Sequence, residues 1–243
     1  MIFRSDKEST RNEEMQAELR AQIKRPVPIV TYVLIGLNIL VYVAMFIAQR
    51  VLDLSQTEVL VLFGAKVNVL ISLGQYWRLF TCMFIHIGFL HLLCNCWAIY
   101  VFGRTAEMLF GRVKTIIIYL IAGLAGSVAS FVFSNAIGAG ASGAIFGIVG
   151  SFFYMWFKNR EIFKRVFGPT LLIVLGINFF IGVTQQGVDL WAHLVGLLFG
   201  LLSAFVVGFA REKVQPLQRY VTLFAIIVFI TAGIIYATGL WGI

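Results

Sequence analysis

The sequence predicts an all-α membrane protein. Hydrophobic residue types make up 60% of its 243 residues and charged types only 12%, whereas soluble domains are nearer half apolar and a quarter charged. The mean hydropathy is +0.92. Long stretches carry no charge at all, and about 20 apolar residues are enough to cross a bilayer. This composition excludes a soluble enzyme, a disordered protein and a nucleic-acid-binding protein.

The uncharged stretches predict seven transmembrane helices. The stretch between Lys114 and Lys158 is too long for one helix, so we expect two helices there with a turn at Ser134–Asn135. Each of the other stretches holds one helix: they run over 25–50, 78–104, 165–189, 189–211 and from 219 to the C-terminus.

The basic residues predict the orientation. Most of the 19 Lys and Arg residues lie in the N-terminal tail and in alternate connections. Under the positive-inside rule these segments are cytoplasmic, which places the C-terminus outside the cell (plasma) membrane. The polar N-terminal segment of roughly 25 residues and the length of the first predicted helix argue against a cleaved secretory signal.

The helices divide the chain into three parts. A cytoplasmic tail is expected at 1–25, a six-helix core at 26–210, and a linker with the seventh helix at 211–243. The first loop, roughly 51–75, is long, contains an apolar run and leads into Tyr76-Trp77-Arg78. Because Trp and Tyr favour the headgroup level, we expect an amphipathic hairpin on or in the outer leaflet.

Several polar side chains fall at membrane depth, where such groups are costly and indicate function. His91 and Asn95 are four residues apart, so they share one face of the second predicted helix. Ser142 begins the fourth helix and His193 lies near the start of the sixth. These three helices run in the same direction, so we expect all four side chains in the outer part of the bilayer.

The fourth predicted helix is short, at about 24 Å for its roughly 16 residues. We therefore expect it to begin at Ser142 below the outer surface, with 138–140 entering as irregular backbone around a cavity. The exposed N–H groups of such a helix start favour negative charge. The pairs Gly143/Gly147 and Gly196/Gly200 predict close packing of the fourth and sixth helices.

Each of these polar residues also has a structural interpretation. Ser142 alone fits packing, His193 fits an interfacial histidine, and His91 with Asn95 fits an interhelical hydrogen-bond pair. Their joint occurrence at one depth favours a catalytic site.

Four stretches resemble the rhomboid family of intramembrane serine proteases: 76–81, 91–95, 140–143, and 192–196 with Gly200. The resemblance covers roughly 26–208. It implies a rhomboid-like bundle, in which the seventh helix is the extra C-terminal span of one branch of the family.

The resemblance also implies roles for individual residues. Ser142 matches the nucleophile and His193 the general base of a Ser–His dyad, while His91, Asn95 and the Ser142 backbone N–H match the oxyanion hole. The positions expected to support the site are Gly140, Gly143, Phe146, Gly196 and Gly200. The ring of Phe146 is expected to stack on the imidazole. Arg78 and Glu107 match positions with a structural role. Asp189 is interpreted as an N-cap, with a contribution to the orientation of His193 left open.

These matches imply an intramembrane serine endopeptidase, a hydrolase that cleaves transmembrane helices near the outer face. Its expected partners are transmembrane substrates and lipids, with no metal, cofactor or nucleic acid.

Two other functions stay open. One is a non-catalytic rhomboid-like protein that binds membrane clients, although such relatives lack the serine or the histidine. The other is a channel or transporter, although acidic residues are nearly absent from the predicted spans.

Overall fold

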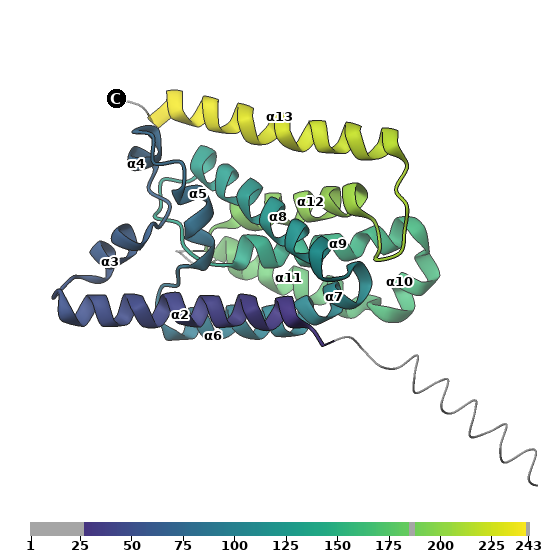
Figure 1. Cartoon of the computed structure of the whole chain (residues 1–243), viewed down its shortest axis with the longest axis horizontal. Helices are drawn as coiled ribbons and strands as arrows, with labels where there is room; N and C mark the ends of the chain where they lie inside the picture. Colours follow the sequence, from purple (N-terminus) through teal and green to yellow (C-terminus); the bar gives the residue numbers. More distant parts are fainter. Residues whose placement is uncertain (1–26, 185–187, 242–243) are drawn as a thin grey trace, which may run out of the picture.

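A computed structural model describes residues 27–184 and 188–241 as a bundle of helices (Figure 1). The predicted tail at 1–25 lies outside the described residues. Six long helices are single α-helical segments: α2 (Ile29–Val51), α8 (Arg112–Phe133), α9 (Ser142–Lys158), α11 (Gly168–Thr184), α12 (Leu190–Val207) and α13 (Pro216–Trp241).

The remaining long helical segment differs from the prediction at both ends. It consists of α6 (Phe89–Ala98), a π-helical turn η2 (Ile99–Gly103) and α7 (Arg104–Phe110). The helical segment before it, Arg78–Phe84, lies at 90° to Phe89–Phe110. The break between the two segments contains Gly88, which adopts a φ of 81°. The connection between the second and third predicted helices, which begins at the charge of Arg104, is itself mostly helical, because the helix continues past Arg104 and only Gly111 separates α7 from α8.

The first connection contains short helices. They are α3 (Gln56–Phe63), α4 (Asn68–Ser72), α5 (Arg78–Thr81) and the 3-10 turn η1 (Cys82–Phe84). Ser55 and Glu58 form a capping box at the start of α3, and Gly64 ends that helix in the left-handed conformation. The apolar run that the sequence singled out lies within α3. Its depth in a membrane stays a prediction.

Among the described residues, four helices are long and apolar enough to cross a membrane: α2, α8, α12 and α13. The bent pair Arg78–Phe84 and Phe89–Phe110 makes a fifth candidate. α9 and α11 have 17 residues each, or about 25 Å, and α9 begins at Ser142 as predicted. The long segments follow the predicted order, while the number that cross the membrane stays a prediction.

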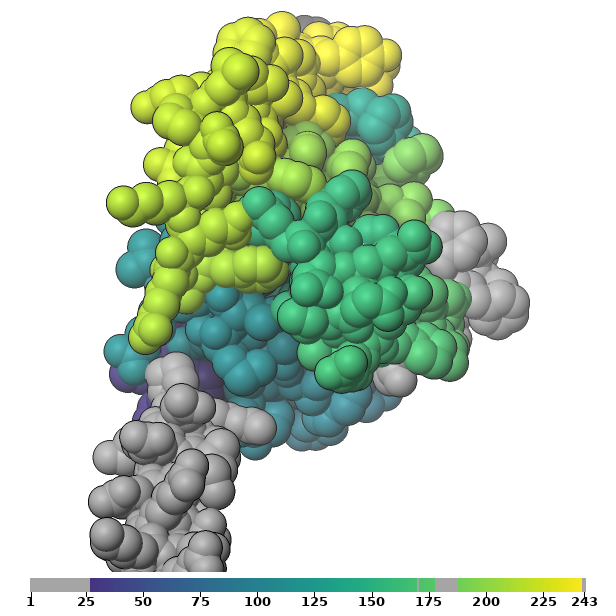
Figure 2. Space-filling model, turned by 90° about the vertical axis from the view of Figure 1, so that its right-hand side faces the viewer, coloured from purple at the N-terminus to yellow at the C-terminus, as the bar shows by residue number. Residues whose placement is uncertain are grey.

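The centre of the bundle is formed by α8, α9 and α12, which pack on one another. α13 lies along the outside against α8 and α12, opposite α2 (Figure 1). Figure 2 views the molecule from the end that carries α10 (Arg160–Val166), with the yellow α13 along its upper edge. This arrangement leaves the starts of α9 and α12 at the end where the first connection lies.

Glycines bring the backbones of α9 and α12 into contact. A methyl group added to Gly196 would overlap the carbonyl oxygen of Gly143, and one added to Gly200 would overlap that of Gly147. Backbone atoms cannot move aside as a flexible side chain can, so only glycine fits. Gly196 and Gly200 therefore let α12 approach α9 more closely than any larger residue at these two positions would.

We expect Gly200→Ala to lower the thermal unfolding temperature of the protein in detergent, because overpacking costs about 1–3 kcal/mol. Gly36→Ala is the matched control, since nothing lies within 4 Å of a methyl group added there. Alanine is also the better helix former by about 0.8–1 kcal/mol, so the control should be as stable as the parent or more so. Equal unfolding temperatures for both variants would contradict this view of the interface.

Candidate active site

Ser142 and His193 face each other across the contact between α9 and α12. The Nε2 atom of His193 lies 2.8 Å from the hydroxyl oxygen of Ser142, which is hydrogen-bonding distance. Ser142 is the first residue of α9. His193 is in the first turn of α12, whose start is capped by Asp189 through a bond of 3.0 Å from the Ala192 amide. The hydroxyl and imidazole are thus fixed by two helix starts.

The ring of Phe146 stacks on the imidazole of His193. The ring centroids are 4.3 Å apart and the planes differ by 12°. Phe146 is one turn after Ser142 on α9, so one helix carries both the hydroxyl and the flat surface beside the imidazole. This packing limits the rotation of the imidazole and keeps Nε2 directed at the hydroxyl.

His91 borders the same place from α6. A methyl group built on Gly140 would lie 2.9 Å from Nε2 of His91 and 3.7 Å from the hydroxyl oxygen of Ser142. Gly140 has a φ of +136°, a conformation that favours glycine. Gly140 therefore allows the imidazole of His91 to approach the start of α9.

Asn95 is placed differently from the other predicted site residues. Its side chain is buried, and its amide nitrogen donates to the His91 carbonyl oxygen over 2.8 Å, within its own helix. An amide nitrogen carries two protons, so the second is not used by this bond. The structure brings Ser142, His193 and His91 around one point, and it leaves Asn95 bonded to α6.

The segment before Ser142 is irregular, as predicted, and its backbone is bonded to the first connection. Lys66 and Gly138 exchange two backbone hydrogen bonds of 2.9 and 3.0 Å, and the Gly140 amide donates to the Cys82 carbonyl over 2.9 Å. Buried backbone groups need such partners. The first connection thus holds the chain that leads into the start of α9.

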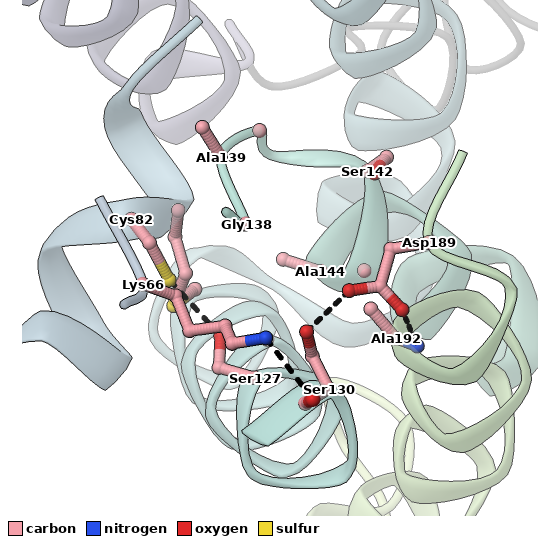
Figure 3. A pocket seen from close by; sticks show the side chains of 14 residues that line it. Lys66, Cys82, Ser127, Ser130, Gly138, Ala139, Ser142, Ala144, Asp189 and Ala192 are labelled. Atoms are coloured by element: carbon pink, nitrogen blue, oxygen red, sulfur yellow. Dashed lines mark hydrogen bonds between the residues drawn. The ribbon is translucent and has the colours of Figure 1, made fainter. Parts of the chain in front are cut away.

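A small cavity of about 40 Å³ lies beside Ser142 (Figure 3). Its walls include polar groups from three parts of the chain: Lys66 of the first connection, Ser127 and Ser130 of α8, and Asp189 at the start of α12. A polar cavity of this size has room for at least one water molecule. The site therefore has a polar side next to the hydroxyl.

A second, larger cavity of about 300 Å³ lies beside His193, between α9, α11 and α12. Its walls are almost entirely apolar. The lining residues are Phe146, Leu175, Gly176, Leu190, His193, Leu194 and Leu197. The Ser142 side of the site thus borders the small cavity with polar walls, and the imidazole of His193 borders the apolar one.

Arg78 braces the first connection. Its buried guanidinium donates to the carbonyl oxygens of Val61 and Ala65 over 2.8 and 3.1 Å, and to the Gln75 side chain over 2.7 Å. A buried cation without such acceptors would be costly. These bonds tie the end of α3 to the start of α5.

Glu107 is a buried carboxylate of α7 that binds the start of α2. Its carboxylate accepts bonds of 2.6 Å from both the amide and the hydroxyl of Thr31, and one of 3.2 Å from the Val30 amide. A carboxylate at the N-terminus of a helix satisfies its free N–H groups. Glu107 therefore joins α7 to α2.

Lys66 is a polar residue of this region that the sequence did not lead us to expect at the site. Its side chain is 1% exposed, and its ammonium donates to the carbonyl oxygens of Ser130, Ser134 and Ala136 over 3.1, 2.8 and 2.9 Å. Burial lowers the pKa of Lys66 from 10.5 to about 8, although the Asp189 carboxylate partly opposes this. The only sequence signal was a single lysine among apolar residues.

Comparisons with known proteins agree with this fold. Residues 73–210 match the family model described as "Rhomboid domain". The chain is 38% identical over 201 residues to "Rhomboid protease GluP" of Bacillus subtilis, which covers 83% of this chain and 39% of that protein. It is 28% identical over 148 residues to "Putative rhomboid protease YdcA" of the same organism, covering 60% of this chain and 74% of that one.

A plant relative is also similar. "RHOMBOID-like protein 6, mitochondrial" of Arabidopsis thaliana is 34% identical over 182 residues, covering 66% of this chain and 59% of the relative. The chain thus spans less than two thirds of the length of GluP and of this plant protein.

The apolar helices and the family match define a multi-pass membrane protein with an all-α fold. The chain belongs to the rhomboid family.

The lowered pKa of Lys66 predicts how its contribution to stability depends on pH. Between pH 8 and 10.5 the unfolded chain holds a proton on this group that the folded chain does not, so this contribution rises with pH. We expect the wild type to gain stability relative to Lys66→Met as the pH is raised from 7 to 10. Thermal unfolding of both proteins in detergent measures this difference. A difference that stays constant across the range would mean that Lys66 keeps its ordinary pKa.

Proposed function

We propose that this chain is an intramembrane serine endopeptidase that uses Ser142 and His193 to cleave transmembrane helices of other membrane proteins. The observation that carries the proposal is the distance of 2.8 Å between the Ser142 hydroxyl and the His193 imidazole. Membership of the rhomboid family, which includes a relative named "Rhomboid protease GluP", supports the same activity. Orientation with the N-terminus in the cytoplasm, in a plasma membrane, is part of the proposal and is supported by the distribution of basic residues.

The chemistry follows from the pairing of the two groups. A serine hydroxyl is a weak nucleophile until a base accepts its proton. His193 accepts that proton while the Ser142 oxygen attacks the carbonyl carbon of the scissile bond. The imidazolium then protonates the leaving amine, and water hydrolyses the acyl-enzyme with His193 again acting as the base.

The oxyanion of the tetrahedral intermediate needs hydrogen-bond donors. The backbone N–H of Ser142 lies in the first turn of α9, where helix N–H groups have no partner within the helix. His91 borders the same point through Gly140. Asn95 supplies the remaining donor either with its second amide proton or by turning away from the His91 carbonyl. These donors act in a low-dielectric site, where fixed charges and dipoles count for more.

One cavity fits the substrate helix, and the other fits the water that hydrolyses the acyl-enzyme. A transmembrane substrate is apolar, and the apolar cavity between α9, α11 and α12 opens beside the imidazole. A substrate that enters laterally along α11 would have to unwind locally, because the carbonyls of an intact helix are already hydrogen-bonded. The polar cavity beside Ser142 has room for the water that completes hydrolysis.

Cleavage of a model transmembrane substrate in proteoliposomes tests the dyad. We expect the wild type to cut near the outer end of the substrate helix, and Ser142→Ala and His193→Ala to lose cleavage, because the nucleophile or its base is missing. Gly36→Ala serves as a folded control. Cleavage by Ser142→Ala at the wild-type rate would exclude the proposal. Specific substrate binding without cleavage by the wild type would favour a client-binding protein instead.

Substitution of the oxyanion donors gives a graded result. His91→Ala and Asn95→Ala should each lower kcat by about 10²–10³-fold, which is the usual effect of removing one such donor. KM should change little, because the donors act mainly on the transition state. Steady-state kinetics with the same substrate measures both values. An Asn95→Ala variant with wild-type kcat would show that the amide remains bonded to α6 during the reaction.

A further inference from the structure

The end of α8 is bonded to three other parts of the chain through a network of polar groups. Lys66, from the first connection, donates to the carbonyl oxygens of Ser130 and Ser134 at this end and to that of Ala136 in the irregular segment. On its other side, the hydroxyl of Ser130 donates to the carboxylate of Asp189 at the start of α12. Figure 3 shows these side chains around the small cavity.

Each charged atom of the network has a hydrogen-bond partner. The three ammonium protons of Lys66 have three carbonyl acceptors. One carboxylate oxygen of Asp189 accepts from Ser130 and the other from the Ala192 amide. Ser130 is 2% exposed and Lys66 is 1% exposed. Buried charges are tolerated only when they are bonded in this way, so the network has one well-defined arrangement.

The network leads directly to both residues of the dyad. The irregular segment that Lys66 holds, through Ala136 and the backbone pairing with Gly138, continues into Ser142. The helix start that Asp189 caps carries His193 one turn later, and the His193 amide donates to the Asp189 carbonyl over 3.2 Å. The segments that carry the two reacting groups are therefore both hydrogen-bonded, through this network, to the same end of α8.

We propose that Lys66, Ser130 and Asp189 are positioning residues that set the distance between the Ser142 hydroxyl and the His193 imidazole. This proposal rests on the proposed function for its kinetic consequences. None of the three side chains bonds to the hydroxyl or to the imidazole in the described structure. They act through the backbone segments that carry the dyad.

The cap at Asp189 allows a sharp test, because asparagine keeps its geometry and removes its charge. The side-chain oxygen of Asn caps helices as well as that of Asp, and its nitrogen can donate to the Ser130 hydroxyl. Alanine removes both bonds. We expect Asp189→Asn to keep kcat within about 5-fold of the wild type, and Asp189→Ala and Ser130→Ala to lose about 10–100-fold, in the range that a 1 Å misplacement costs.

The kinetics are measured well below the unfolding temperature of each variant, with the reconstituted chain of residues 1–243. KM should stay near the wild-type value, because the apolar cavity is unchanged. Ser203→Ala is the matched control: it removes a buried serine hydroxyl that bonds to Phe199 within α12, away from the network. This control should keep wild-type kcat. Wild-type kcat for Asp189→Ala, or equal losses for Asp189→Asn and Asp189→Ala, would overturn the proposal.

A second measurement reads the distance without relying on cleavage. The double variant Ser142→Cys, His193→Cys is prepared with Cys82, Cys94 and Cys96 replaced by alanine, and its oxidative cross-linking is followed in detergent. Adding Asp189→Ala should slow cross-linking about 10-fold or more, while adding Ser203→Ala should not. Unchanged cross-linking with Asp189→Ala would overturn the positioning role. If the wild type cleaves nothing, the proposed activity fails, and this measurement still decides the positioning role.

Discussion

The structure depends on the close approach of α9 and α12. Their backbones touch where Gly143 and Gly147 meet Gly196 and Gly200, and no other residue fits at Gly196 or Gly200 without displacing a backbone carbonyl. This contact allows a serine hydroxyl on one helix and an imidazole on the other to lie 2.8 Å apart. Small residues at helix interfaces are a general means of close packing in membranes. Here they also determine which side chains meet.

Buried charged side chains elsewhere in the bundle bind segments that are far away in the sequence. Arg78 binds the carbonyls at the end of α3, Lys66 binds those at the end of α8, and Glu107 binds the start of α2. In a bilayer, an unsatisfied polar group costs several kcal/mol. The irregular backbone before Ser142 is possible only because the first connection supplies partners for it. The long first connection therefore supports the site from one side, and the glycine contact supports it from the other.

The features predicted correctly from the sequence are those with local causes. The start of α9 at Ser142, the cap at Asp189 and the glycine pairs all follow from residues within a few positions of each other. The helix break after Phe84 and the continuation past Arg104 were missed. A charge marks the end of an apolar stretch, but it does not end a helix. The bonds of Lys66 were also beyond prediction, because they depend on how segments far apart in the sequence pack together. The bond of the Asn95 amide to the His91 carbonyl was beyond prediction because it depends on the rotamer of Asn95.

The most direct test of the central claim is the reaction of the membrane-embedded protein with a fluorophosphonate probe, followed by mass spectrometry of the modified peptide. A nucleophilic serine activated by an imidazole should give one adduct, on Ser142, and the rate of labelling should fall steeply when His193 is replaced by alanine. An adduct on a different serine, or labelling that proceeds at the same rate without the imidazole, would show that the two groups do not act together.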